Sequence, residues 1–151
     1  MINIWFDGAC EPKNPGGACG MGYVIKRDDK LLFEKGDFLP ADPSNSNNVA
    51  EYIALNSALR YCLNHPDEIR GHEIECRGDS KLVIEQMFGN WRIKSGAYVP
   101  YARQCISLIE KIGRYKVSGI WIPREQNSKA DELSKREMKR SGVKFKIQPD
   151  V

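Results

Sequence analysis

The sequence of 151 residues lacks the long apolar segments and terminal signals that mark membrane and exported proteins. No apolar run approaches the ~20 residues that a helix needs to span a bilayer. The N-terminus has no basic segment followed by a sustained apolar stretch, so we expect no signal peptide. Linkers, repeats and low-complexity segments are also missing. We therefore expect a single domain over residues 1–151 with no membrane partner, in which residues 142–151 carry no clear element.

Cysteine and histidine do not form a metal-binding pattern in this chain. The only histidines are His65 and His72, and no two cysteines have C-x-x-C spacing, so a zinc site is not expected. An odd number of cysteines is typical of reduced thiols in a cytoplasmic protein. The five are Cys10, Cys19, Cys62, Cys76 and Cys105.

A dinucleotide-binding motif is missing as well. Residues 16–22 are rich in glycine but do not match G-x-G-x-x-G. They are followed by a predicted strand, whereas that motif needs a helix after it. The sequence therefore excludes the commonest nucleotide-cofactor site.

Positive charge is concentrated near the C-terminus, although the net charge is only +3. Residues 111–146 hold 11 Lys or Arg and 4 acidic residues, whereas residues 1–110 hold 12 and 15. A basic region of this kind is compatible with a polyanionic partner. The alternative is a solvated helix face, and charge alone favours that interpretation.

Hydrophobic periodicity predicts five strands and four helices. We expect the strands at residues 1–7, 20–26, 31–35, 73–77 and 116–122. The first helix should begin at one of the N-cap residues 46–48 and end near 64, and the others should cover 81–88, 98–112 and 127–141. Three successive strands followed by alternating strands and helices predict an α/β fold. Its mixed sheet would have three antiparallel strands, then two parallel ones, with helices on both faces.

Four acidic residues lie at comparable places in this scheme. Asp7 ends the first predicted strand, and Asp79 directly follows the fourth. Glu51 lies in the first turn of the first helix, and Asp131 lies near the start of the last one. Because open α/β sheets place their sites at the carboxyl ends of parallel strands, we expect the four side chains to converge there.

Taken singly, three of these acids have a structural explanation. Asp7 precedes a glycine, as in a turn, and Asp79 is a suitable helix N-cap. Ser128 and Asp131 have the spacing of a capping box. Glu51 is harder to explain, because its neighbours on the helix are apolar and a desolvated carboxylate is costly.

Converging carboxylates would repel one another and raise their pKa values unless a cation neutralised them. A site made of oxygen ligands without His or Cys favours Mg²⁺ or Mn²⁺ over zinc. Two such ions can clamp the attacking and leaving oxygens of a phosphodiester. The four acids therefore point to metal-dependent phosphodiester chemistry.

Four motifs then make the chain resemble type 1 ribonuclease H. They are residues 6–8 with 14–17, 46–52, 78–84 and 127–134, and the resemblance extends from residue 1 to about 140. It implies a ribonuclease H-like fold and hydrolysis of the RNA strand of an RNA/DNA hybrid, which leaves 5′-phosphate and 3′-hydroxyl ends. It also implies a monomer that uses two Mg²⁺ (or Mn²⁺) ions. Whether double-stranded RNA is a second substrate stays open.

The resemblance assigns roles to individual residues. Asp7 matches the carboxylate that bridges both metal ions, Glu51 and Asp79 complete the ligands of one ion, and Asp131 joins Asp7 on the other. Glu51 is also placed to accept a hydrogen bond from the RNA 2′-hydroxyl. The implied substrate-binding residues are Gly8, Asn14, Gly16, Asn47, Asn48, Ser80, Trp91 and Lys94.

Two segments depart from the common family pattern. Many members carry a His in the loop after the fifth strand, whereas residues 123–127 read Pro-Arg-Glu-Gln-Asn, as in an archaeal-type branch. Arg124 is the candidate replacement, through contact with a phosphate, and an exposed loop charge is the alternative. Some members also insert a Lys-rich protrusion between residues 89 and 101. Here Trp91 and Lys94 are candidates to touch the DNA strand, with a core position as the alternative for Trp91.

Two other functions fit the same fold less well. A 3′–5′ exonuclease usually has an Asp-x-Glu pair on its first strand, and residues 7–9 lack the Glu. A non-catalytic hybrid-binding module would be expected to have lost an acid, and all four are present.

Overall fold

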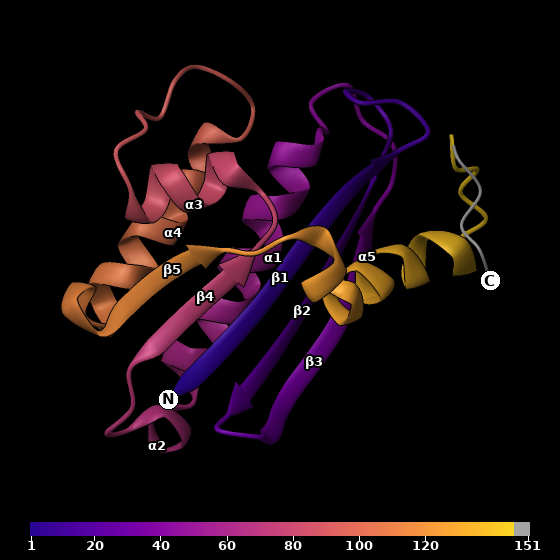
Figure 1. Cartoon of the computed structure of the whole chain (residues 1–151). Coiled ribbons are helices and arrows are strands. Elements are labelled where there is room, and N and C mark those ends of the chain that lie inside the picture. The colour runs from indigo at the N-terminus through magenta and orange to yellow at the C-terminus, as the bar shows by residue number, and fades with distance from the viewer. Residues whose placement is uncertain (147–151) are drawn as a thin grey trace.

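A five-stranded sheet organises the computed structural model, which describes residues 1–146 (Figure 1). Its strands lie in the order β3-β2-β1-β4-β5. They are β1 (Ile2–Glu11), β2 (Ala18–Arg27), β3 (Lys30–Leu39), β4 (Ile74–Gly78) and β5 (Val117–Trp121). The first three pair antiparallel, and β4 lies parallel to both β1 and β5. The predicted α/β fold with a mixed sheet is confirmed.

Helices cover both faces of this sheet, as expected. Helix α5 lies across β1, β2 and β3 on one face, whereas α1 packs on β1 and β2 from the other, with α4 against α1 and α3 against β5 (Figure 1). Strand β2 is therefore covered twice, and its first eight residues are all buried. The helices are α1 (Asn47–Asn64), α2 (Pro66–Ile69), α3 (Lys81–Phe88), α4 (Val99–Ile112) and α5 (Ser128–Arg140).

Local sequence signals set several of these boundaries. The Ser46 hydroxyl accepts a hydrogen bond from the Val49 amide and caps α1, as predicted. Helix α1 ends at Asn64, one residue before His65, because Pro66 disfavours helical backbone at the residue preceding it. Three short elements were not predicted: α2 and the 3₁₀ turns η1 (Arg114–Lys116) and η2 (Arg124–Gln126).

The first strand is longer than predicted, and Asp7 lies inside it instead of at its end. The predicted turn after Asp7 is wrong, because β1 stays paired with β2 as far as Glu11. The pairing of β1 with β4 does end near Asp7, because it covers only residues 2–5 of β1. Beyond Trp5 the β4 side of β1 is therefore free of a strand neighbour, and this opening holds the site.

The segment after α5 returns to the sheet. Val143 and Phe145 join a small apolar cluster with Ala18 of β2 and Met138 of α5. The last part of the segment that carried no clear element in the sequence, residues 147–151, lies outside the described residues. In the described part of the chain, no helix is long and apolar enough to cross a membrane.

Candidate active site

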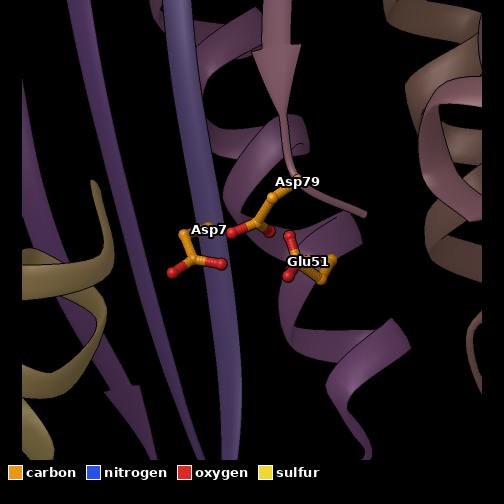
Figure 2. A group of neighbouring side chains, drawn as sticks. All are labelled: Asp7, Glu51 and Asp79. Atoms are coloured by element: carbon orange, nitrogen blue, oxygen red, sulfur yellow. The ribbon is translucent and has the colours of Figure 1, made fainter. Parts of the chain in front are cut away.

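Three of the four predicted carboxylates converge at the opening beside β1. Asp7 comes from β1, Glu51 from α1 and Asp79 from the residue after β4, and their carboxylates point toward one another (Figure 2). One oxygen from each lies within 4.8 Å of the others. Glu51 is the fifth residue of α1, so it belongs to the second helical turn and not to the first, as the sequence had suggested. This spacing suits carboxylates that share a cation.

Two glycines allow the helices to reach Asp7. A Cβ at Gly8 would overlap the backbone of Ala50 and Glu51, so only glycine lets α1 pack this closely on β1. Gly22 pairs with Asp7 in the sheet, and a Cβ there would overlap the backbone of α5 at Ala130. Both helices that carry a predicted acid therefore lie directly against the strand that carries Asp7.

Burial and mutual repulsion raise the pKa values of the three acids. Burial, followed by the neighbouring Asp79 carboxylate, raises the pKa of Asp7 to about 8. Burial and the charges of Asp7 and Asp79 raise the pKa of Glu51 well above its usual range. Burial also raises the pKa of Asp79, against the opposing effect of the Arg124 guanidinium. The group is thus a poor environment for three negative charges without a cation.

One oxygen of this group has no partner within the chain. Glu51 is only 7% exposed, and its Oε2 atom has no hydrogen-bond partner among the described residues. Buried carboxylate oxygens are normally hydrogen-bonded or bound to a metal. The oxygen donors present therefore fit a hard divalent cation such as Mg²⁺ or Mn²⁺.

Asp131, the fourth predicted acid, lies in the same cleft but has cationic partners. The Lys135 ammonium is 3.1 Å from its Oδ1 and 3.2 Å from its Oδ2. The Arg124 guanidinium is 3.7 Å from Oδ1. Asp131 does not belong to the group of three. The capping-box alternative is wrong, because no side chain caps α5 and its N-cap residue is Asn127.

The site forms the floor of a large cleft with a volume of about 1270 Å³. Its walls bring together all four acids, three lysines and Arg124. The lining residues are Asp7, Gly8, Ala9, Cys10, Glu11, Pro12, Lys13, Asn14, Asn47, Glu51, Asp79, Trp121, Arg124, Asp131, Lys135, Phe145 and Lys146. The cleft thus has an acidic floor and cationic edges, which suits a phosphate backbone approaching a metal-binding centre.

The predicted substrate residues divide into two groups. Gly8, Asn14 and Asn47 line the cleft. The remaining five do not line it, and they are Gly16, Asn48, Ser80, Trp91 and Lys94. The Ser80 hydroxyl is used as the N-cap of α3. The Trp91 side chain is 49% exposed, which excludes the core position that the sequence left open.

The sequence and the fold have clear counterparts among known proteins. A family described as "Reverse transcriptase-like" matches residues 5–137. Ribonuclease HI of Haemophilus influenzae is 32% identical over 145 residues, which cover 90% of this chain and 88% of that protein. The chain belongs to the type 1 ribonuclease H family.

Solved structures of ribonucleases H agree with this assignment. LC11-RNase H1, isolated from compost by a metagenomic approach, has a TM-score of 0.83 and 29% identity over 93% of this chain and 97% of that one. A structure of LC11-RNase H1 in complex with an RNA/DNA hybrid has a TM-score of 0.81. The chain spans only 31% of the length of a bifunctional Mycobacterium tuberculosis protein to which it is 33% identical.

Two residues beside the four acids had no predicted role in the site. The Asn127 side chain donates a hydrogen bond to the Phe6 carbonyl at 2.9 Å and so joins the start of α5 to β1 next to Asp7. Lys135 pairs with Asp131 across one helical turn. Its i,i+4 spacing is a signal that the sequence does contain. The partner of Asn127 is more than 100 residues away, so no local pattern reveals it.

Proposed function

We propose that this protein hydrolyses the RNA strand of RNA/DNA hybrids and leaves 5′-phosphate and 3′-hydroxyl ends. The observation that carries the proposal is the convergence of Asp7, Glu51 and Asp79 in a cleft, with a buried Glu51 oxygen that lacks a partner. Membership of the family and the hybrid bound by LC11-RNase H1 support the choice of substrate.

The four acids are proposed to hold two Mg²⁺ or Mn²⁺ ions. Asp7, Glu51 and Asp79 would hold one ion, and Asp7 and Asp131 the other. Such an ion pair supplies a nucleophile at neutral pH and stabilises both the attacking and the leaving oxygen of the phosphodiester. All four acids come from one chain, which agrees with activity as a monomer.

The protein's own residues orient the substrate around this centre. Asn14 and Asn47 line the cleft and can donate from their side-chain amides to the strand that is cut. The Glu51 carboxylate would also accept a hydrogen bond from an RNA 2′-hydroxyl, which would distinguish RNA from DNA. Gly8 contributes a wall that consists of backbone alone.

Arg124 is proposed to contact the phosphate that is attacked. Its side chain is 70% exposed and lines the cleft, and its guanidinium reaches the acidic floor at Asp131. A guanidinium can bind a phosphate through two parallel hydrogen bonds, and its high pKa excludes it as a proton donor at neutral pH. Arg124 would therefore orient the substrate and stabilise charge without transferring a proton.

The remaining predicted contacts lie outside the cleft walls and extend the proposed binding surface. Trp91 and Lys94 belong to the segment between α3 and α4, where an exposed indole can stack and a lysine can bind phosphate. Asn48 and Ser80 directly follow the cleft residues Asn47 and Asp79 in the sequence, and Gly16 lies two residues from Asn14.

A cleavage assay with several substrates tests the proposal. Four matched duplexes of one sequence are compared: an RNA/DNA hybrid, the inverse hybrid, double-stranded RNA and double-stranded DNA, each with Mg²⁺, Mn²⁺ or a chelator. We expect metal-dependent cuts within the RNA strand of both hybrids, with ends that a 3′-hydroxyl-dependent polymerase can extend. Equal cleavage of double-stranded DNA, or unchanged activity in the chelator, would refute the proposal. The double-stranded RNA arm decides whether that substrate is also cut.

A further inference from the structure

A buried asparagine outside the cleft connects the loops that flank it. Asn45 lies in the loop between β3 and α1 and is only 5% exposed. Its side-chain Nδ2 donates to the Gly17 and Pro40 carbonyls, both at 2.9 Å. Its backbone carbonyl accepts a hydrogen bond from the Gly16 amide at 2.9 Å. One residue therefore joins the β1–β2 loop, the end of β3 and the approach to α1.

The same two loops carry the two asparagines that line the cleft. The Asn47 amide donates to the Asn14 Oδ1 atom at 3.0 Å, which connects the loops at their cleft side. The Cys10 amide, on the β1 edge that has no strand neighbour, donates to the Asn47 Oδ1 atom at 2.9 Å. Because both amide oxygens already accept a bond from the backbone, each side chain is held with its NH₂ group left to donate.

This orientation matters for a nucleic-acid substrate. Phosphate oxygens are acceptors only, and two NH₂ groups held at a fixed separation match acceptors along a strand. Asn45 lies two residues from Asn47, and its partners Gly16 and Gly17 lie two and three residues from Asn14. Asn45 therefore fixes the separation of the two donors, although its own side chain does not line the cleft.

We propose that Asn45 is a positioning residue for hybrid binding, which holds the loops so that Asn14 and Asn47 present their amides together. This inference rests on the proposed function. None of the hydrogen bonds of Asn45 reaches Asp7, Glu51 or Asp79. The loss of Asn45 should therefore weaken the binding of the substrate and leave the metal-binding group and the chemical step unaffected.

Two substitutions separate this role from a general effect on folding. Asn45→Ala removes both side-chain hydrogen bonds. Asn45→Asp keeps the size of the side chain but places an acceptor where a donor faced two carbonyls. Asp42→Ala is the matched control, because Asp42 lies in the same loop and its carboxylate bonds only to Ser44 in the described structure.

The experiment measures hybrid binding in a chelator by fluorescence anisotropy, followed by kcat and KM with Mg²⁺. For both Asn45 variants we expect the Kd and KM for the hybrid to rise roughly tenfold. We expect kcat to stay within about twofold and the thermal shift on addition of Mg²⁺ to match the wild type. Asp42→Ala should leave all four quantities within about twofold of the wild-type values.

Other outcomes have distinct meanings. Unchanged Kd and KM in the Asn45 variants would overturn the proposal, and so would a loss of kcat at constant KM. A lower melting temperature with unchanged Kd would reduce Asn45 to a purely structural residue. If one variant fails to fold, the other provides the comparison. A wild-type protein that neither binds nor cuts the hybrid would instead refute the proposed function itself.

Discussion

The two ends of the cleft floor hold the same kind of side chain in opposite electrostatic surroundings. At one end Asp7, Glu51 and Asp79 face one another, and burial is the largest cause that raises their pKa values, with repulsion from neighbouring carboxylates second for Asp7 and Glu51. At the other end Asp131 faces the ammonium of Lys135 and the guanidinium of Arg124. No ion pair joins a cation to the three acids within the described chain, although the charge of Arg124 acts on Asp79, whereas Asp131 already pairs with two cations.

This difference predicts different affinities for a divalent ion at the group of three and at Asp131. A divalent ion entering the group of three relieves repulsion and satisfies the unpartnered Glu51 oxygen, so binding there is favoured in the free protein. An ion at Asp131 must instead compete with Lys135, which lies within hydrogen-bonding distance of both carboxylate oxygens. We therefore expect the two ions to bind with unequal affinity, the first at the three acids.

The largest effect is expected when one of the three carboxylates of Asp7, Glu51 and Asp79 is replaced. Asp79→Asn should lower kcat for hybrid cleavage by roughly 10³-fold or more, because metal binding supplies several kcal/mol to the transition state. Asp67→Asn is a matched control, since Asp67 is exposed and pairs only with Arg70 in the described structure. Rates are measured on a labelled hybrid, with circular dichroism to verify folding. A variant that keeps a tenth of the wild-type rate would contradict the assignment of Asp79.

The pH dependence of stability tests the raised pKa of Asp7, which burial and then repulsion produce. With its pKa near 8, Asp7 in the folded protein keeps a proton that the unfolded chain releases near pH 4. The metal-free protein should therefore lose several kcal/mol of stability as pH rises from about 4 to 8. Asp7→Asn should flatten this slope, and Mg²⁺ should oppose it in the wild type. Urea unfolding in a chelator measures the effect, and equal slopes for the two proteins would contradict it.

Arg124 is predicted to act on the chemical step more than on binding. Arg124→Ala should lower kcat roughly tenfold and change KM less than threefold, because the guanidinium would contact the phosphate that is attacked. Arg124→Lys should recover part of the rate, since it restores charge without the bidentate geometry. Steady-state kinetics on the hybrid supply both constants. An unchanged kcat would return Arg124 to the role of an exposed loop charge.

The smallest expected effect is on Mg²⁺ binding at Asp131 when its partner Lys135 loses its charge. Lys135→Met removes the closer of the two cationic partners of Asp131 while keeping an apolar stem of similar length. Partly exposed ion pairs contribute about 0.5 kcal/mol, so the weaker Mg²⁺ site should bind its ion two- to threefold more tightly. Isothermal titration with Mg²⁺ measures this change. Weaker binding in the variant would show that Lys135 supports the metal site instead of competing with it.

Much of the fold could be predicted because its signals are local. The α3 range of residues 81–88 follows from helical spacing that ends before Gly89, and the Ser46 cap was visible as a side-chain type. The strand containing Asp7 was misjudged for a physical reason. An Asp-Gly pair favours a turn when considered alone, but pairing with β2 through Glu11 outweighs that preference.

The site was predictable at the level of residue types but not of partners. The convergence of Asp7, Glu51 and Asp79 followed from their places on the elements, and the structure confirms it. The bridge made by Asn45 depends on contacts between segments distant in the sequence, and no local pattern marks it. The position of Asp131 in the same cleft was predicted, but its pairing with Arg124 and Lys135, which separates it from the other three acids, was not.

Direct measurement of metal binding tests the central claim, that Asp7, Glu51 and Asp79 form a divalent-cation site. Mn²⁺ is titrated into the wild type and into Glu51→Gln, and electron paramagnetic resonance reports the free ion. We expect the wild type to remove Mn²⁺ from solution and Glu51→Gln, with the same fold, to bind at least tenfold more weakly. Equal Mn²⁺ binding by the two proteins would contradict it.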